Sequence, residues 1–422
     1  MSEQIKAIKG MKDLLPDAID VWHGVEQVIR ELTEAYGYAE IRLPIVERTE
    51  LFKRSIGEYT DIVEKEMYTF TDNDGDQLTL RPEATASCMR AGIEHGLFYK
   101  KPARLWYLGP MFRHERPQKE RYRQFYQFGI EAIGWPGPDI DAEVLLFGER
   151  LWRKLGVTDV TLEINSLGSA ASRHQFKNDL VSYLQLHETD LDADSQRRVN
   201  GNPLRILDSK NEQTQEILDG APNLLDYLDS EARQHFDGLC GYLDENKVNY
   251  RVNPRLVRGL DYYSSTVFEW VTDKLGAQNA VCAGGRYDGL IEQLGGQSTP
   301  SAGFAMGMER VIALAAQNDA LSWQRSPDVY LVLMGDAARQ AGLGWAEKLR
   351  DRNIKTIVHC GEGSMKSQMK RADKCGAQFA LILGDDEIAQ GTATIKSLRN
   401  DTEQQQLAME QVVDYLKPRA DT

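Results

Sequence analysis

The sequence is poor in cysteine and has no long apolar run. Its 422 residues include five scattered cysteines, Cys88, Cys240, Cys282, Cys360 and Cys375, without a Cys-x-x-Cys pair. This argues against a disulfide framework and a zinc site and indicates a reducing compartment. No apolar run approaches the roughly twenty residues that span a bilayer, and the first ten residues lack a signal-like pattern. We expect a cytoplasmic protein with no membrane partner.

Common catalytic motifs are absent as well. There is no Gly-x-x-x-x-Gly-Lys-Ser/Thr, which excludes a P-loop, and no Gly-x-Gly-x-x-Gly that opens a helix, which argues against a dinucleotide-binding fold. The seven histidines are dispersed, without His-Glu-x-x-His, and no serine elbow occurs. The sequence therefore lacks the motifs of a hydrolytic triad and of a metal-dependent hydrolase, and we expect no metal held by protein ligands. The run Ser364-Met-Lys-Ser is interpreted as a helix cap.

Charge is unevenly distributed along the chain. The whole sequence has 50 Lys and Arg against 64 Asp and Glu, a formal net charge of −14. Between Arg113 and Arg123, however, five basic residues face two acidic ones, a local charge of +3. A basic loop on an acidic protein indicates a local anion contact and not a bulk polyanion binder. The stretch from Lys348 to Lys374 has a local charge of +5, which fits either a solvated helix face or an RNA-contacting patch.

The basic loop lies inside a predicted hairpin. Residues 106–131 read as two antiparallel strands, and alternation places Arg113 and Glu115 on one face of the first strand. On the second strand one face carries Phe125, Gln127, Gly129 and Glu131, and the other carries Tyr126, Phe128 and Ile130.

The first of these faces therefore combines guanidinium, carboxylate, amide and, at Gly129, bare backbone. Charged groups rarely gather on a sheet interior without partners. We predict a binding site for a small zwitterionic or anionic ligand. For Arg113 or Glu131 taken alone, a solvated sheet face is the alternative.

Arginine is the remaining candidate for catalysis. Arg113, Arg258 and Arg310 each occur next to or close to glycine or an aromatic residue. Several permanent cations without a general base are typical of phosphoryl or nucleotidyl transfer, in which charge develops on phosphate oxygens. A planar guanidinium can grip two of those oxygens. Glu83 can hold an ammonium group, and an amine together with ATP indicates amino-acid activation.

Hydrophobic periodicity predicts the elements of the first part of the chain. We expect a helix over Asp17–Tyr36, a short strand over Ala39–Leu43 and a hairpin over Met67–Arg81 that turns at Asp74-Gly75. Residues 169–249 are charged and helix-forming, and strand-like sequence resumes at Tyr250. We interpret this stretch as a helical insertion.

A third region begins after residue 327. Strands are predicted over Val329–Met334, Lys355–His359, Phe379–Leu383 and Thr394–Leu398, with helices between the first three. This alternation indicates a βαβ-type module.

Several segments resemble known motifs over essentially the full length of the chain. Tyr38–Arg48, Phe112–Glu131 and Gly303–Arg310 are similar to the three motifs of class II aminoacyl-tRNA synthetases, the first of which forms a dimer. Two longer runs, Leu256-Val-Arg-Gly-Leu-Asp-Tyr-Tyr263 and Ala283-Gly-Gly-Arg-Tyr-Asp288, resemble signatures of the histidyl-tRNA synthetase family.

The resemblance implies an α+β fold. It consists of an antiparallel catalytic sheet of about six to seven strands flanked by helices, a helical insertion, and a C-terminal α/β anticodon-binding domain with a mixed sheet. The implied boundaries are 1–168 and 250–324 for the two parts of the catalytic domain, 169–249 for the insertion and 327–422 for the anticodon-binding domain.

The resemblance also implies how histidine is bound. Glu83 and Thr85 would hold the α-amino group, and Gln127 would lie near the carboxylate. Defined partners for the two ring nitrogens would reject other amino acids. The full implied set is Glu83, Thr85, Arg113, Gln127, Glu131, Arg258, Tyr262, Tyr263 and Tyr287, of which Glu131, Tyr263 and Tyr287 would read the imidazole.

For ATP, the resemblance assigns Arg113 to the α-phosphate and Glu115 to the adenine amino group. Phe125 would stack on the purine, with Arg310 on its other face and reaching the γ-phosphate. Arg258 would approach the α-phosphate from the histidine side, supplementing Mg²⁺. Arg113, Arg258 and Arg310 are the implied catalytic residues. Arg116, Gln118, Lys119, Arg121 and Arg123 would steer the acceptor end of tRNA, with ATP as the alternative ligand of Arg121 and Arg123. Of these two, Arg121 is assigned to ATP and Arg123 to the acceptor end.

The implied reaction has two steps. The histidine carboxylate attacks the α-phosphorus of ATP and releases pyrophosphate. The terminal 3′-hydroxyl of tRNA(His) then attacks the adenylate carbonyl, and we hypothesise that an adenylate phosphate oxygen takes its proton. The expected ligands are L-histidine, ATP, Mg²⁺ and tRNA(His), and the expected assembly is a homodimer.

Two alternatives remain at this point. The histidine-sensing regulatory subunit of ATP phosphoribosyltransferase is synthetase-like, but it would be expected to lack the C-terminal domain and parts of the arginine set. A synthetase for threonine or proline shares the type of C-terminal module, but the run Arg258–Tyr263 argues against it.

Overall fold

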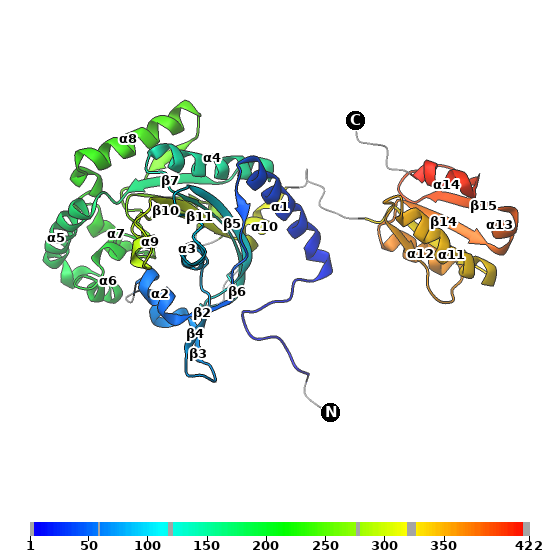
Figure 1. Cartoon of the computed structure of the whole chain (residues 1–422), viewed down its shortest axis with the longest axis horizontal. Coiled ribbons are helices and arrows are strands. Elements are labelled where there is room, and N and C mark those ends of the chain that lie inside the picture. Colours follow the sequence, from blue (N-terminus) through cyan, green and yellow to red (C-terminus); the bar gives the residue numbers. More distant parts are fainter. Residues whose placement is uncertain (1–3, 58–59, 117–120, 276–278, 319–325, 417–422) are drawn as a thin grey trace. The chain divides into compact units, whose positions relative to one another are not determined.

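The structure is a computed structural model that describes residues 4–57, 60–116, 121–275, 279–318 and 326–416. The chain forms two compact units, Met1–Trp323 and Gln324–Thr422 (Figure 1). The division of the first unit into two catalytic parts and an insertion, with the boundaries given above, stays a prediction.

The first unit is built on an eight-stranded sheet. Its order is β1-β5-β6-β11-β10-β9-β7-β8. The strands are β1 (Ala39–Glu40), β5 (Ala103–Phe112), β6 (Gln124–Ile133), β7 (Thr161–Ser166), β8 (Tyr250–Val252), β9 (Thr266–Val271), β10 (Ala280–Arg286) and β11 (Ser301–Gly307). The inner six are antiparallel, as expected, but β1 pairs parallel to β5 and β8 parallel to β7. The sheet is therefore mixed at its edges. In the case of β8, the helices between β7 and β8 return the chain so that the two strands run in the same direction.

The predicted hairpin is confirmed as β5 and β6. Tyr107 lies opposite Gly129 and Leu105 opposite Glu131. One part of the prediction is wrong: β5 ends at Phe112, so Arg113 and Glu115 lie beyond the strand and not on its face. Regular pairing continues past Pro110 to Phe112, opposite Gln124, and the basic loop follows.

Four helices cover one face of this sheet. They are α1 (Pro16–Ala35), α4 (Pro138–Lys154), α8 (Ser230–Glu245) and α10 (Met308–Ala315). The apolar stripe of α1 and the even-numbered face of β6, with Phe128 and Ile130, enter one large core centred on Phe147. Burial of these faces leaves the opposite face of the sheet to form the site. The expected helix at residues 17–36 is confirmed.

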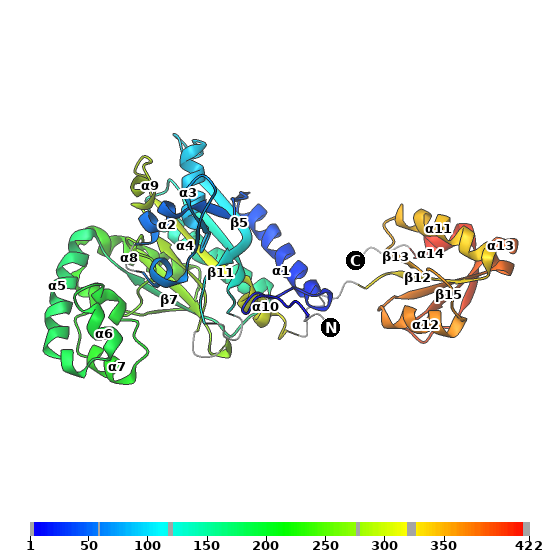
Figure 2. The same ribbon diagram turned by 90° about the horizontal axis from the view of Figure 1, so that it is seen from below.

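Helices also border the other face, beginning with α3 (Thr85–Glu94). The chain between β7 and β8 is helical as expected, and before α8 it forms α5 (Ala170–Leu186), α6 (Ala193–Arg198) and α7 (Glu212–Leu218). Figure 2 shows α5, α6 and α7 gathered at one end of the unit. Apolar side chains of α5 and α7 share a second core with Tyr262, Tyr263 and Tyr287. The short helix α9 (Leu290–Gln293) closes this side.

A small sheet with the order β2-β4-β3 stands apart from the large one. It contains β2 (Val46–Arg48), β3 (Tyr68–Thr71) and β4 (Gln77–Leu80), and α2 (Thr49–Ile56) follows β2. The predicted hairpin over residues 67–81 is confirmed, and Gly75, with φ of 91°, sits in its turn. The strand expected over Ala39–Leu43 is shorter, since β1 ends at Glu40.

The second unit has a mixed five-stranded sheet with the order β13-β12-β14-β15-β16. The four predicted strands are confirmed as β12 (Val329–Met334), β13 (Thr356–Val358), β14 (Phe379–Gly384) and β15 (Thr392–Ser397), and β16 (Gln405–Ala408) was not predicted. The helices are α11 (Asp336–Arg350), α12 (Met365–Lys374), α13 (Asp385–Gln390) and α14 (Met409–Leu416). The cap prediction is confirmed, because the Ser364 hydroxyl accepts a hydrogen bond from the Ser367 amide at 3.3 Å.

In the described parts of the chain, no helix combines the length and the apolar character that crossing a membrane requires.

Phe147 provides a test of the large core. Its fully buried ring contacts those of Tyr36, Tyr38, Phe128 and Phe304. Phe147→Ala should lower the free energy of unfolding by about 3–5 kcal/mol, because a large cavity replaces the ring. Urea unfolding of the full chain measures the change. Leu186→Ala, at a position that is 82% exposed, is the control and should stay within about 0.5 kcal/mol. Equal effects of the two variants would contradict this account of the core.

Candidate active site

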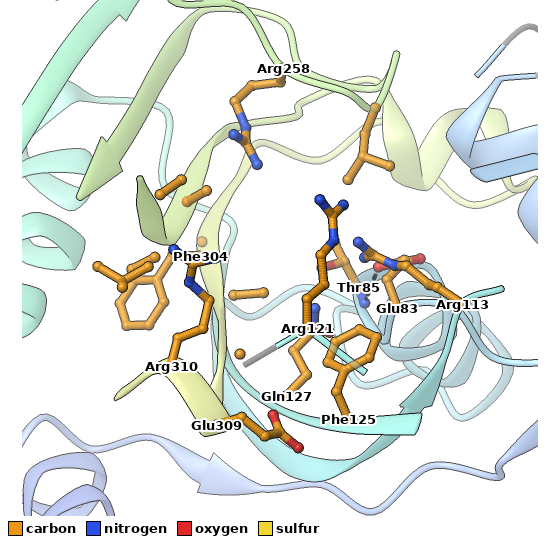
Figure 3. A pocket seen from close by; sticks show the side chains of 18 of the residues that line it. Glu83, Thr85, Arg113, Arg121, Phe125, Gln127, Arg258, Phe304, Glu309 and Arg310 are labelled. Carbon is orange, nitrogen blue, oxygen red and sulfur yellow. Dashed lines mark hydrogen bonds between the residues drawn. The ribbon is translucent and has the colours of Figure 1, made fainter. Parts of the chain in front are cut away.

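A deep cavity opens on the face of the large sheet that α1 and α4 leave uncovered. Its volume is about 220 Å³, and it opens to solvent. Arg113, Arg258 and Arg310, the three arginines predicted from distant parts of the sequence, all line it. Figure 3 shows that they enter the same space from different sides, together with Arg121.

Small residues form the floor of the cavity. Ala283 on β10 and Gly303, Ala305 and Gly307 on β11 line it, and the last three alternate along their strand. A Cβ atom on Gly303 would lie 2.2 Å from the carbonyl oxygen of Ile130 and 2.4 Å from Glu131 Oε2. The glycine therefore leaves room for the buried carboxylate of the neighbouring strand.

Glu83 and Thr85 meet the cavity at the start of α3. The amides of Thr85 and Ala86 donate to the Glu83 carboxylate at 2.6 and 3.1 Å, which orients the carboxylate at the helix N-terminus. Burial raises the pKa of Glu83, and these two amides and Arg113 oppose the shift. The arrangement offers a buried, fixed acceptor, which suits an ammonium group.

Glu131 lies behind the lining side chains and is 1% exposed. Thr85 Oγ1 donates to its Oε1 at 2.8 Å, and the Tyr287 hydroxyl donates to its Oε2. Burial raises the pKa of Glu131 to about 8. The predicted imidazole reader is thus a carboxyl group that is easily protonated, reached from the cavity through Thr85 and Tyr287.

Gly129 serves a different purpose from the one expected. It was predicted to present bare backbone to a ligand, but a Cβ atom there would lie 2.4 Å from the Tyr107 hydroxyl and 2.9 Å from the carbonyl oxygen of Phe304. The Tyr107 ring fills this space from the opposite strand, and its hydroxyl lies 3.3 Å from Thr85 Oγ1. Gly129 therefore makes room for a buried tyrosine.

Three tyrosines and one glutamine complete this end of the cavity. The rings of Tyr262, Tyr263 and Tyr287 contact one another with centroids 4.7 to 6.1 Å apart. Gln127 Oε1 is buried and has no hydrogen-bond partner among the described residues. An acceptor left open in this way suits a ligand that brings its own donors.

The opposite end of the cavity is formed by the hairpin loop. Arg113 donates from Nε to the carbonyl of Pro82 at 2.9 Å, and its guanidinium lies 5.3 Å from the centroid of the Phe125 ring. Arg121 pairs with Glu115. Burial lowers the pKa of Arg113 and of Arg121, and for Arg121 the charges of Arg113 and Arg310 add to this effect. The cations therefore lie close enough to repel one another, and this part of the cavity favours the binding of an anion.

Arg258 and Arg310 come from the other half of the unit. Arg258, in the loop between β8 and β9, forms an ion pair with Glu269 and lies 5.6 Å from the centroid of the Tyr263 ring. Arg310 belongs to the first turn of α10, directly after β11. All of the predicted histidine and ATP residues thus lie in or directly behind one cavity.

The structure gives less support for the residues predicted to contact the tRNA acceptor end. Arg116 is exposed and does not line the cavity. Arg123 donates from Nε to the carbonyl of Glu115 at 3.2 Å and from NH1 to that of Lys9 at 3.5 Å. Gln118 and Lys119 lie outside the described residues. All four assignments stay predictions.

Some residues at the site were missed. Glu309 lines the cavity and accepts a hydrogen bond from the Tyr126 amide at 2.9 Å, and burial raises its pKa to about 7. It stands in the quoted run Gly307–Arg310, so its position next to Arg310 was the available signal. Tyr107 had no such signal, because its position opposite Gly129 depends on the register between β5 and β6.

Arg286, the last residue of β10, supports the site from behind Tyr287. It is 1% exposed and donates to the Asp141 carboxylate of α4 and to the carbonyls of Trp135 and Gly137. His235 Nε2 on α8 lies 2.8 Å from the same carboxylate. This network fixes the end of β10 and hence the position of Tyr287.

Comparison with known proteins agrees with this geometry. Residues 10–311 match the family model described as Histidyl-tRNA synthetase, and residues 328–419 match that of an anticodon binding domain. The structure of apo S. aureus histidyl-tRNA synthetase is similar, with a TM-score of 0.82 and 36% identity over 98% of this chain and 100% of that one.

More distant structures share the fold. A histidyl-tRNA synthetase from a Nostoc species has a TM-score of 0.73 and 19% identity, covering 99% of this chain and all 100% of its own. A Bacillus halodurans protein described as an ATP phosphoribosyltransferase regulatory subunit/histidyl-tRNA synthetase has a TM-score of 0.67 and 18% identity, with coverages of 91% and 99%.

The raised pKa of Glu131 predicts a pH dependence. The pKa of Glu131 in the folded protein, about 8, exceeds the ordinary carboxyl pKa of ~4.3. The stability that protonated Glu131 contributes is therefore full below about pH 4.3 and is lost as the pH rises through about 8. Glu131→Gln resembles the protonated form. Unfolding in urea from about pH 5 to about pH 8.5 should therefore show the variant gaining stability relative to the parent protein. A constant difference across this range would contradict the assignment.

Proposed function

The chain belongs to the histidyl-tRNA synthetase family, so it activates L-histidine with ATP and charges tRNA(His), and we propose how the residues of the cavity perform this reaction. The observation that carries the proposal is the shared cavity, in which Arg113, Arg258 and Arg310 surround the space next to a buried set of polar groups that fits an amino acid.

Histidine occupies the end of the cavity formed by α3 and the tyrosines. Glu83 accepts from the α-ammonium group, and Gln127, with its open Oε1, lies close by. Glu131 reads the imidazole through Thr85 and Tyr287, whose hydroxyl groups donate to its two carboxyl oxygens. An amino acid without ring nitrogens leaves these buried groups unpaired, which is a strong basis for rejection.

ATP occupies the arginine-lined end. Phe125 and Arg310 enclose the adenine, Glu115 contacts its amino group, and Arg121 contacts the phosphates. Arg113 and Arg258 approach the α-phosphate from two sides. As the histidine carboxylate attacks the α-phosphorus, these two guanidinium groups stabilise the added negative charge and pyrophosphate leaves. Preorganised cations suit this step because no proton has to move.

Mg²⁺ fits the same end of the cavity. This ion takes most of its ligands from water and phosphate oxygens and needs only one or two carboxylates. Glu309 uses one carboxylate oxygen for the Tyr126 amide. The other would be the ligand from the protein, which departs from the expectation of no protein metal ligand. When bound, Mg²⁺ neutralises phosphate charge.

In the second step the terminal 3′-hydroxyl of tRNA(His) attacks the adenylate carbonyl, and a phosphate oxygen of the adenylate accepts its proton. Arg116 and the basic loop that follows Glu115 contact the acceptor end, and the second unit binds the anticodon.

A synthetase meets its tRNA where translation takes place, so the proposed location is the cytoplasm. The proposed assembly is a homodimer, for which the exposed Ile45 and Val46 within the first motif supply apolar surface.

The regulatory-subunit alternative has less support. The complete arginine set lines the cavity, and the second unit matches an anticodon binding domain. A threonine or proline synthetase does not account for the family match of residues 10–311.

Amino-acid specificity can be tested directly. Pyrophosphate exchange into ATP should depend on histidine and should be at background with threonine, proline and the other standard amino acids, since only histidine pairs the buried acceptors around Glu131. Absence of exchange with histidine, together with histidine binding in calorimetry, would point to a sensing protein instead.

Arg116 separates the two steps of the reaction. Arg116→Ala should lower the rate of tRNA charging by a factor of about ten or more, because it removes a phosphate contact to the acceptor end, and should leave pyrophosphate exchange near the parent rate. Rapid-quench charging assays and exchange assays on one preparation compare the two. Equal losses in both assays would refute the assignment.

A further inference from the structure

We propose that Glu269 is a positioning residue for adenylate formation, which it serves by holding the Arg258 guanidinium at the cavity through a direct ion pair. The inference rests on the proposed function, since it takes Arg258 to act on the α-phosphate. No motif quoted from the sequence includes Glu269.

The backbone alone fixes Arg258 poorly. It lies in the irregular segment between β8 and β9, and a long side chain on a loop has many rotamers to choose from. Glu269 is in the middle of β9, paired with Ala283 on one side and Glu163 on the other. A strand inside a sheet has little freedom to move, so the Glu269 carboxylate has a fixed position. The ion pair therefore restricts the positions that the Arg258 guanidinium can take.

Glu269 reaches Arg258 but not the ligand. Ala283, its neighbour across the sheet, lines the cavity, whereas Glu269 is not among the described lining residues. The two charged side chains are only 16% and 18% exposed, so water screens the pair weakly. Burial lowers the pKa of Arg258, but Glu269, together with smaller contributions from Tyr263 and Tyr262, outweighs burial, so the pKa of Arg258 is raised.

The geometry also leaves donors for a substrate. NH1 of Arg258 is the atom that pairs with Glu269. Its Nε is buried and has no hydrogen-bond partner among the described residues. A guanidinium has five N–H donors in a fixed plane, so one edge can be anchored by a carboxylate while the rest meets a phosphate oxygen. The Tyr263 ring, 5.6 Å away, restrains the group from a further direction.

Glu163 provides a matched control. It lies directly opposite Glu269 on β7, is also buried, and pairs with Arg251 and Asn253, neither of which lines the cavity. Glu163→Gln and Glu269→Gln thus remove the same charge from adjacent positions on one sheet, but only the second releases Arg258.

The test compares these variants in the full-length protein. Glu269→Gln should lower kcat of histidine-dependent pyrophosphate exchange by about 10- to 100-fold, because a misplacement of about 1 Å at a reacting centre has effects of this size, while KM for histidine changes much less. Glu269→Asp should recover part of kcat, and Glu163→Gln should remain close to the parent. Thermal unfolding of each variant verifies its fold.

A double-mutant cycle with Arg258→Ala decides whether Glu269 acts through Arg258. The combined variant should be no slower than Arg258→Ala alone. If Arg258→Ala is slow but Glu269→Gln equals the parent, or if Glu269→Gln and Glu163→Gln are equally slow, the positioning role is wrong and the proposed function stands. If Arg258→Ala itself exchanges at the parent rate, the proposed role of Arg258 fails.

Discussion

The mutual repulsion of guanidinium groups in a partly buried cavity is the constraint on which the site depends. Four arginines project into one space, and burial together with neighbouring positive charge disfavours the charged state of Arg121. The fold compensates locally: Glu115 pairs with Arg121, Glu269 pairs with Arg258, and the Pro82 carbonyl accepts from Arg113. Excess positive charge that is already oriented needs little reorganisation when a triphosphate arrives.

The sheet makes this gathering of charge possible. Large aromatic side chains on its covered face hold the strands in place. On the open face, glycine and alanine at alternate positions of β11 leave space for the cavity. The same strands bring Arg310 and Tyr287 to the cavity from segments far apart in the sequence. Catalytic side chains thus occupy loops and helix starts, and a rigid scaffold fixes the distances between them.

Much of this arrangement could be predicted from local patterns. Alternation along residues 106–131 placed Gln127 and Glu131 on the site face and Phe128 in the core. The absence of other catalytic motifs left the three arginines, and the motif resemblance then assigned their roles. Patterns of period two could not show where β5 ends, so Arg113 and Glu115 were assigned to a strand that they only follow. Nor could they show that Gly129 accommodates Tyr107, because that contact depends on cross-strand register.

The buried carboxylate of Asp141 has a consequence for the evolution of the chain. It is shared by Arg286, which precedes the tyrosine at the end of β10, and by His235, which belongs to the helical stretch between β7 and β8. Deleting that stretch would open the Asp141–Arg286 pair to water and loosen the strand terminus. A shortened descendant would therefore have to acquire another side chain in the place of His235 before it could dispense with these helices.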